Sequence, residues 1–474
     1  MKKIRAFCLF LAAALTVLLL SPGVAAQDIP TADQSVLSGC HSVDAAMQLN
    51  EQGKLTETAK AAIVYERNSD TMIYAHNPDQ RIYPTSMVKL MTALVAIEKG
   101  DPQAKVKVTK RAISDLPLGA AVVKPKLEPG EELTLEDLLY CLVAASANDA
   151  AMVIAEYIAG SQDAFLTMMN QKAQELGCKD TVFTNPHGLH DPNMYTTARD
   201  LCRITDAALD NELFKALFCA DSHVIPATNK CEERTVYTGN HMISKAEIKK
   251  YYDPRVTGGK TGTVDGGGRC LIATSEQGGM ELLTVVMDAK PTYEPNGLAL
   301  ATFGSFEETT VLMNHVFANY TCRQIFYEGQ IVSQYPVSGG ANSAVTIPAR
   351  GASTVLPVGV EKDQLNWVYT NYATTLTAPV EKGQRISVLQ VWYGSKCVAQ
   401  TDLVAVNAVK AQTEYIQTER SDGENAGKVW LIVAIVLVAV VVLVGGSIVA
   451  LRWTRRFRLN ARRRSRRADR RRSR

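Results

Sequence analysis

Stretches of alternating hydrophobic and polar positions lie at both ends of residues 42–319, and the middle of this region has hydrophobic residues at helical spacing. Near the start, "AKAAIVYERNSDTMIYAHN" predicts a hairpin, because two runs of residues that favour β-strands flank the turn sequence "RNSD". Near the end, "RCLIATSEQGGMELLTVVMDA" predicts two strands around a glycine turn, and "SFEETTVLMNHVFANYT" predicts a closing helix. We therefore expect one α+β domain whose first and last strands meet in a single sheet.

Helical periodicity dominates the centre of this region. The stretch "YPTSMVKLMTAL" opens a helix predicted over residues 86–99, because apolar side chains from Met87 onward recur at helical spacing. The stretch "TLEDLLYCLVAASANDAAMVIAEYIAG" predicts two apolar helices broken around residues 146–148. Two more helices are predicted in "SQDAFLTMMNQKAQELG", which Ser161 caps and Gly177 ends, and in "TARDLCRITDAALDN".

A different pattern follows from about residue 343 to residue 409. Short alternating runs such as "AVTIPARGASTVLPVGV" are separated by proline and glycine, which predicts a small all-β domain. Residues 412–428 are mostly polar and predict a flexible stalk. Because the chain is too long for one core, we expect an α+β domain over residues 27–335 and a β-rich domain over residues 336–411.

The two ends of the chain predict export and membrane attachment. Residues 1–26 combine a basic start, an apolar core and small residues before a cleavage point, which is the pattern of a signal peptide. Residues 429–451 carry no charge and are long enough for a transmembrane helix. Residues 452–474 hold thirteen Arg and one Asp, and a basic block beside a span marks the cytoplasmic side. We expect a single-pass protein of the cell membrane whose folded body lies outside the cytoplasm.

The net charge of the predicted folded body differs in sign from that of the whole chain. The whole chain carries +3, of which the tail supplies +12 and the signal +3, so the body between them carries about −12. A body of this sign offers no basic surface for nucleic acid, and we expect no nucleic-acid partner. The nine cysteines after the signal form no C-x-x-C pair, and no spacing predicts a metal site or a cofactor.

Three short sequence motifs, taken together and in their order along the chain, indicate a catalytic site. Each is weak by itself, but the first opens an apolar helix, the second lies between two helices, and the third lies on a strand. On a helix, residues three apart lie one turn apart, so a lysine there can act as the base for a serine hydroxyl. The motifs, each found once, are S-x-x-K at Ser86 and Lys89, S-x-N at Ser146 and Asn148, and K-T-G at Lys260, Thr261 and Gly262.

These motifs resemble those of the serine penicillin-recognising enzymes, and longer matches narrow the resemblance. The stretches "AIVYERNSDTMIYAHNPDQRIYPTSMVKLMTAL", "NPHGLHDPNMYTTARDL" and "GGKTGTVDGGGRCLIAT" look like low-molecular-mass D-alanyl-D-alanine carboxypeptidases, peptidase family S11. The stretch "LTAPVEKGQRISVLQVWYGSKCVAQTDLVAV" resembles the β-rich C-terminal domain of that family. The resemblance covers about residues 59–409. It implies a penicillin-recognising serine transpeptidase/β-lactamase-like domain followed by a small all-β domain.

The resemblance also implies a hydrolase without a cofactor that removes the terminal D-alanine from peptidoglycan stem peptides and binds β-lactam antibiotics. Ser86 is then the nucleophile, Lys89 its base, and Ser146 the relay to the leaving amine. The backbone N–H groups of Ser86 and Thr263 are the expected oxyanion donors. The remaining expected roles concern the substrate: Asn148 contacts Lys89 and the peptide carbonyl, and Lys260, Thr261 and Thr263 receive the terminal carboxylate.

Other functions share parts of this pattern. A β-lactamase would need a glutamate to activate the deacylating water, and its usual E-x-x-L-N string does not occur between S-x-N and K-T-G. A catalytically silent protein that binds or senses wall peptides stays open, as does endopeptidase or transpeptidase activity on D-alanyl peptides.

Three positions depart from the family pattern. Many members read P-A-S-x-T-K, where this chain has Thr85 and Val88 on either side of the serine, and some members have histidine at the position of Thr263. These departures concern the rate and the substrate preference rather than the presence of a nucleophile. His187 in "NPHGL" is expected to have a structural role in a loop.

Overall fold

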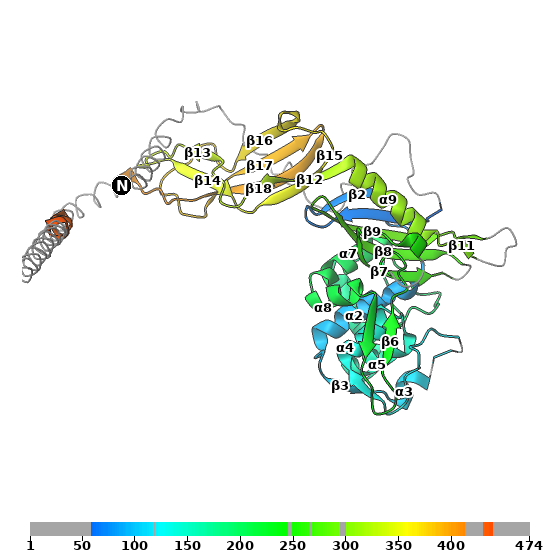
Figure 1. The fold of residues 1–474 in the computed structure, drawn as a ribbon. Helices are drawn as coiled ribbons and strands as arrows, with labels where there is room; N and C mark the ends of the chain where they lie inside the picture. The colour runs from blue at the N-terminus through cyan, green and yellow to red at the C-terminus, as the bar shows by residue number, and fades with distance from the viewer. Residues whose placement is uncertain are drawn as a thin grey trace, which may run out of the picture.

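The structure, a computed structural model, contains a mixed α/β domain followed by a smaller all-β domain (Figure 1). The predicted signal peptide, nearly all of the predicted stalk, the second half of the predicted span and the basic tail lie outside the described residues. The structure describes residues 58–114, 116–117, 119–244, 249–264, 267–293, 300–412 and 430–438.

A five-stranded antiparallel sheet forms the centre of the first domain, in the order β2-β1-β9-β8-β7. β1 pairs with β9, so the first and last long strands of the domain meet in one sheet, as predicted. β7 is an edge strand, which leaves one of its sides open. The strands are β1 (Ala61–Glu66), β2 (Thr71–His76), β7 (Val256–Thr263), β8 (Arg269–Gln277) and β9 (Met280–Ala289).

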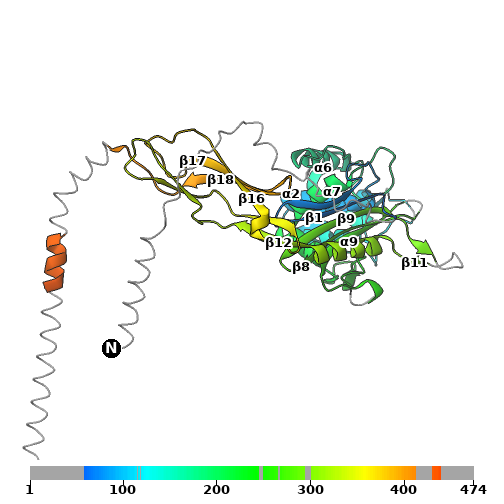
Figure 2. The ribbon, with the colours of Figure 1, turned by 90° about the horizontal axis from the view of Figure 1, so that it is seen from above.

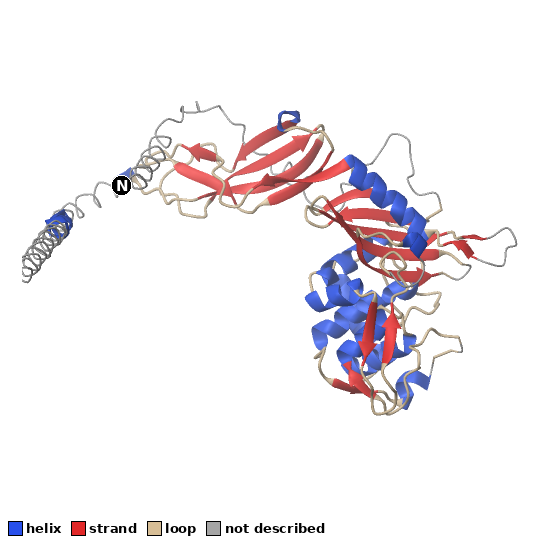
Figure 3. Cartoon of the chain, in the orientation of Figure 1, coloured by secondary structure: helices blue, strands red, loops and turns tan. Residues whose placement is uncertain are grey.

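The two faces of this sheet belong to two separate cores. The helical region covers one face and α9 (Ser305–Asn319) covers the other (Figure 3). Ile63 and Val285 pack in the core on the helical side, whereas Ala62 and Val286 pack in the core that contains the side chains of α9. This division follows from the alternation of side chains along a strand. The helical region contains α2 (Val88–Lys99), α3 (Lys110–Ser114), α4 (Leu135–Val143), α5 (Asn148–Ala159), α6 (Gln162–Glu175), α7 (Ala198–Leu209) and α8 (Glu212–Cys219).

The helices begin where polar caps predict. Thr134 accepts a hydrogen bond from the Asp137 N–H at 3.0 Å at the start of α4, and Ser161 accepts one from the Ala164 N–H at 3.2 Å at the start of α6. The predicted helix at 86–99 begins as a 3-10 turn, η2 (Thr85–Met87), and becomes α-helical at Val88. Short elements complete the domain: β3 (Lys105–Lys107), β4 (Glu132–Thr134), β5 (Ser222–Ile225), β6 (Arg234–Tyr237), η3 (Lys249–Tyr251), β10 (Thr292–Tyr293) and β11 (Leu300–Thr302).

The second domain is all β, and it extends from the end of α9 (Figure 2). Its main sheet has the order β13-β14-β18-β17-β16, and β12 pairs with β15. Because β12 and β13 pair with strands of this domain, its paired strands begin at Tyr320, earlier than the predicted boundary at 336. The elements are β12 (Tyr320–Phe326), β13 (Ser333–Tyr335), β14 (Ala344–Pro348), β15 (Ala352–Pro357), η4 (Lys362–Gln364), β16 (Leu365–Asn371), β17 (Arg385–Tyr393) and β18 (Lys396–Ala405).

The described part of the predicted span, residues 430–438, is helical, and its side chains are exposed. Within the described ranges, no helix combines the length and the hydrophobicity that crossing a membrane requires.

Candidate active site

Ser86 lies in η2, at the entry to α2, where close contacts fix its position. Thr85, just before it, has a φ of +55°, which is uncommon for a residue other than glycine. A Cβ added at Gly188 would lie 2.0 Å from the Thr85 carbonyl oxygen, and one added at Gly262 would lie 2.1 Å from Thr85 Oγ1. Glycine at these two positions therefore lets the loop around Gly188 and strand β7 approach the backbone beside the serine.

Lys89 is the immediate partner of Ser86. Its Nζ lies 3.1 Å from Ser86 Oγ and donates to the backbone carbonyl of His187. The side chain has no solvent exposure. Burial lowers the pKa of Lys89 well below its usual range, and the charge of Lys260 lowers it further. A lysine whose pKa is lowered in this way gives up its proton more readily, and the lone pair of the neutral amine can accept the serine proton.

Lys260 and Ser146 form a second linked pair, although 114 positions separate them in the sequence. Ser146 lies in the break between α4 and α5 with a φ of +57°. Lys260 Nζ donates to Ser146 Oγ at 2.9 Å and to the Thr261 carbonyl oxygen at 3.1 Å. Lys260 is 2% exposed, and burial lowers its pKa to about 7. Its charge therefore depends on pH within the physiological range.

Asn148 is the first residue of α5 and lies two positions after Ser146 in the chain. It is 3% exposed, and its backbone N–H donates to the Ala121 carbonyl oxygen at 2.7 Å. Among the described residues, its side chain forms no hydrogen bond with Lys89. The hydrogen-bond partners of Lys89 Nζ are instead Ser86 Oγ and the His187 carbonyl oxygen.

Asp149 is a candidate that no motif pointed to. Its buried carboxylate accepts backbone hydrogen bonds from Val123 at 3.2 Å and from Leu127 at 3.3 Å. It also lies close enough to Lys89 to oppose the lowering of that lysine's pKa. Asp149 therefore holds residues 123–127 against the start of α5. The available signal in the sequence was its position directly after S-x-N.

The backbone donors expected to form the oxyanion site are both available. The N–H of Val264 donates to the Gly268 carbonyl oxygen at 2.8 Å, and N–H groups alternate in direction along an antiparallel strand. The N–H of Thr263 therefore points away from β8, towards the open edge of the sheet. Within the described part of the chain, the N–H of Ser86 has no backbone acceptor either.

A pocket of about 220 Å³ lies beside this edge and contains Thr261 and Thr263. Arg269, also in its wall, donates to Thr263 Oγ1 at 2.8 Å, and its guanidinium lies 5.2 Å from the centre of the Phe303 ring. Unlike Lys260, arginine keeps its positive charge at every physiological pH. Arg269 is thus a second cation beside K-T-G. No motif identified it, although it begins the strand β8 and pairs there with Thr263 of β7.

His187 has the loop role expected for it. Its carbonyl oxygen accepts from Lys89, and its ring Nδ1 accepts from the Leu189 N–H at 3.1 Å. Burial lowers the pKa of His187 to about 4, and the neighbouring Lys89 adds to this effect. The ring is therefore neutral at physiological pH and engaged within the loop. Among the described residues, no three His, Cys, Asp or Glu side chains gather in a way that could hold a metal ion.

Comparison with known proteins identifies both domains. Residues 47–291 match the family D-alanyl-D-alanine carboxypeptidase, and residues 320–411 match the Penicillin-binding protein 5, C-terminal domain. The chain is 28% identical over 375 residues to D-alanyl-D-alanine carboxypeptidase DacF of Bacillus subtilis (strain 168), which covers 75% of this chain and 87% of the relative. It is 28% identical over 389 residues to D-alanyl-D-alanine carboxypeptidase DacC of Escherichia coli (strain K12), which covers 78% and 86%.

Solved structures have the same architecture. Penicillin binding protein 5 from Haemophilus influenzae aligns with a TM-score of 0.64 at 27% identity, over 76% of this chain and 100% of that one. Penicillin binding protein 6B from Escherichia coli aligns with a TM-score of 0.57 at 25% identity, over 77% and 100%. The fold is therefore a mixed α/β penicillin-binding fold with an all-β C-terminal domain. Since the first family match spans more than half of the sequence, this chain belongs to the D-alanyl-D-alanine carboxypeptidases, peptidase family S11.

Proposed function

We propose that the protein is a serine-type D-Ala-D-Ala carboxypeptidase that removes the terminal D-alanine from peptidoglycan stem peptides. One observation carries the proposal. The Ser86 hydroxyl lies in hydrogen-bond contact with Lys89, a fully buried lysine whose pKa is strongly lowered. A serine hydroxyl is a weak nucleophile until a base takes its proton, and a neutral amine at this distance is such a base.

Acylation uses the two linked pairs. Neutral Lys89 accepts the Ser86 proton while Oγ attacks the carbonyl carbon between the two D-alanines. The N–H groups of Ser86 and Thr263 donate to the oxyanion that develops. The C–N bond then breaks, and the proton held by Lys89 reaches the departing amine through Ser146. The stem peptide remains as an ester on Ser86.

Substrate binding draws on the open edge of β7. The terminal carboxylate of the substrate is placed against Lys260, Thr261 and Thr263, with Arg269 adding a permanent charge. Asn148 lies at the start of α5, where its amide can face the peptide carbonyl.

Deacylation regenerates the enzyme. Lys89 takes a proton from a water molecule, whose oxygen attacks the ester carbonyl. The C–O bond to Ser86 Oγ then breaks, Lys89 gives the proton to that oxygen, and the shortened stem peptide leaves. A β-lactam would acylate Ser86 in the same way, and the resulting ester would clear more slowly.

The alternatives have less support. A β-lactamase would use a glutamate to activate the deacylating water, and the stretch "NPHGLHDPNMYTTARDL", which approaches the backbone beside Ser86 at Gly188, contains no glutamate. A silent wall-peptide-binding protein would have no need for a buried, neutral lysine in contact with a serine hydroxyl. Burial of such a lysine destabilises the fold, and a protein without catalysis gains nothing in return.

We also propose that the catalytic domain works outside the cytoplasm and is anchored by one C-terminal span at residues 429–451. The support is the pattern of the sequence: a signal peptide at residues 1–26 and an arginine block directly after the apolar segment. Peptidoglycan lies outside the membrane, so this placement brings the serine to its substrate.

The test uses the full chain purified in detergent. We expect a fluorescent penicillin to label the wild type and the Ser114→Ala control, in which an exposed serine of α3 is replaced. Ser86→Ala should take no label, and D-alanine release from a D-Ala-D-Ala peptide should be lost with it. Labelling without D-alanine release would overturn the carboxypeptidase assignment, and rapid penicillin hydrolysis would indicate a β-lactamase. The absence of both label and hydrolysis would exclude both enzymes.

A further inference from the structure

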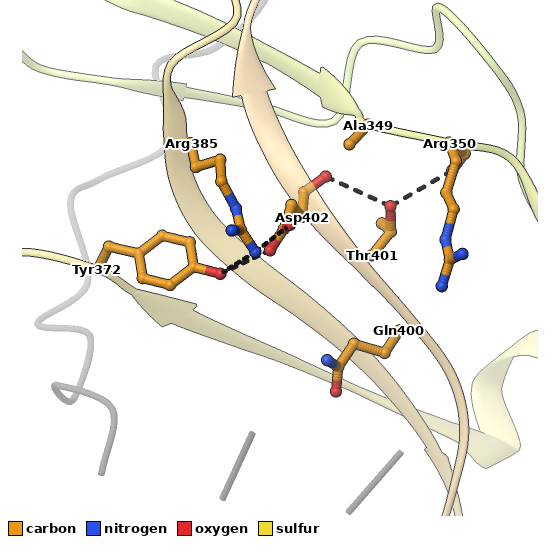
Figure 4. Close-up of a pocket in the computed structure, with 7 residues that line it drawn as sticks. All are labelled: Ala349, Arg350, Tyr372, Arg385, Gln400, Thr401 and Asp402. Atoms are coloured by element: carbon orange, nitrogen blue, oxygen red, sulfur yellow. Dashed lines mark hydrogen bonds and ion pairs between the residues drawn. The ribbon is translucent and has the colours of Figure 1, made fainter. Parts of the chain in front are cut away.

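A larger pocket lies in the β-rich domain, away from the serine site. Its volume of about 360 Å³ is within the range of small-molecule sites, about 300–1,000 Å³. Figure 4 shows the Arg385, Tyr372 and Asp402 group on one side, Arg350 on the other, and Gln400 between them. Every one of these side chains carries hydrogen-bonding groups, so the pocket suits a polar ligand rather than an apolar one.

The backbone around the pocket is held by hydrogen bonds between neighbouring segments. The N–H of Ala349 donates to the Asp402 carbonyl oxygen at 2.8 Å, and Thr401 Oγ1 donates to the Arg350 carbonyl oxygen at 3.3 Å. These bonds fix the turn between β14 and β15, which carries Arg350, to strand β18. The N–H of Tyr372 donates to the Ile386 carbonyl oxygen at 3.1 Å, which fixes the opposite wall to β17.

The charged groups on the first side are already paired. Arg385 forms an ion pair with Asp402, and the Tyr372 hydroxyl donates to Asp402 Oδ1 at 2.6 Å and accepts from Arg385 Nη2 at 3.1 Å. This group is electrically neutral as a whole, and it keeps the Tyr372 ring at the wall, 43% exposed. An exposed ring held in place offers a flat surface on which a sugar or a peptide plane can pack.

Arg350 is different, because it supplies an unpaired cation. Its side chain is exposed, and among the described residues no carboxylate lies within ion-pair distance of its guanidinium. Gln400 uses its Oε1 to accept from Gln390 at 2.8 Å, which leaves its amide N–H groups as donors beside the same opening. The pocket thus combines one excess positive charge with neutral donors.

We infer that this pocket binds a carboxylate of the peptidoglycan polymer, with Arg350 as the charged partner and Gln400 as a neutral donor. The inference rests on the proposed function, which makes that polymer the material the protein works on. A guanidinium matches the two oxygens of a carboxylate in a bidentate arrangement, and the trimmed and untrimmed stem peptides both end in that group. The Tyr372 ring would pack against the adjoining sugar or peptide unit.

The net charge of the protein makes a localised site necessary for such binding. The body carries about −12, so it repels an anionic polymer at long range and has no general affinity for it. A second contact on the same polymer would raise the effective concentration of further stem peptides at Ser86. The β-rich domain would then serve the catalytic domain by keeping the enzyme on its insoluble substrate.

The experiment measures co-sedimentation of the detergent-solubilised full chain with insoluble peptidoglycan. The variants are Arg350→Ala and Arg350→Lys, and the control is Arg323→Ala, which removes a partly exposed arginine of the same domain outside the pocket. We expect Arg350→Ala to weaken polymer binding by about tenfold and Arg350→Lys to weaken it less. D-alanine release from a small soluble peptide should be unchanged in both, which shows that the catalytic domain is intact, and the weaker effect of Arg350→Lys separates loss of the charge from loss of the fold of the β-rich domain.

Two further arms identify the chemistry. Peptidoglycan whose carboxylates have been converted to amides should bind wild type as weakly as untreated polymer binds Arg350→Ala. Equal binding of wild type and Arg350→Ala, or full binding to the amidated polymer, would overturn the inference. Competition by inorganic phosphate without any effect of amidation would also overturn it, in favour of a phosphate ligand. If the wild-type protein released no D-alanine, that result would count against the proposed function. It would leave the inference about polymer binding untouched, because sedimentation is measured independently of turnover.

Discussion

Replacing Lys260 with arginine should change the shape of the enzyme's pH profile, not only its rate. Lys260 is buried and hydrogen-bonded to Ser146 and to the Thr261 carbonyl, and burial lowers its pKa from 10.5 to about 7. If the protonated form receives the substrate carboxylate, the free enzyme loses this cation as pH rises through 7. Arginine keeps its proton throughout this range, so the variant should not lose activity for this reason.

The size of the effect follows from the titration. With a pKa of about 7, about half of Lys260 is protonated at pH 7, about one tenth at pH 8 and about one hundredth at pH 9. We therefore expect kcat/KM, which reports the free enzyme, to fall about tenfold per pH unit above 7 in the wild type. The corresponding fall in kcat should occur at higher pH than the fall in kcat/KM, because the bound substrate carboxylate favours the charged form of Lys260. On the acid side, activity should rise as Lys89 loses its proton.

The assay is D-alanine release from a short D-Ala-D-Ala peptide between pH 6 and pH 9, at constant ionic strength (a range of about three units around the value for Lys260). Lys260→Arg should give a lower kcat/KM at pH 7 but a level profile above it. Lys107→Arg, on an exposed strand, is the matched control and should keep the wild-type shape. A level wild-type profile up to pH 9, or the same falling limb in Lys260→Arg, would refute the assignment of this limb to Lys260.

Three further substitutions test the contacts around the site. Gly262→Ala places a methyl group 2.1 Å from Thr85 Oγ1, which should displace β7 and lower kcat/KM by about a hundredfold. Adding Thr85→Ala should restore part of the activity, and a double variant no more active than the single one would argue against this contact. Arg269→Ala should raise KM for the peptide by about tenfold with a smaller change in kcat, and an unchanged KM would remove Arg269 from substrate binding. Asp149→Ala leaves three buried backbone donors, of Val123, Leu127 and Ala150, without their side-chain acceptor and should lower the free energy of unfolding by about 2–4 kcal/mol in urea denaturation. An unchanged midpoint would show that the loop does not depend on this carboxylate.

Local physics explains which features could be predicted. Residues three apart on a helix lie one turn apart in any protein, so the contact between Ser86 and Lys89 follows from the apolar repeat that predicts the helix. The cap at Ser161 and the hairpin of β1 and β2 are equally local, and they form as predicted. Each of these features depends on the chain's own neighbours and not on how distant segments pack.

The tertiary structure alone decides the chemistry of the two lysines. Nothing in the residues next to Lys260 shows that it reaches Ser146 across 114 positions, or that both lysines are removed from water. Their lowered pKa values come from desolvation, and desolvation depends on every segment that packs over the site. The same holds for Asp149 and Arg269, whose partners lie on other loops and strands. The sequence by itself thus determined the candidate nucleophile and its base, whereas the three-dimensional packing determined the protonation state in which they work.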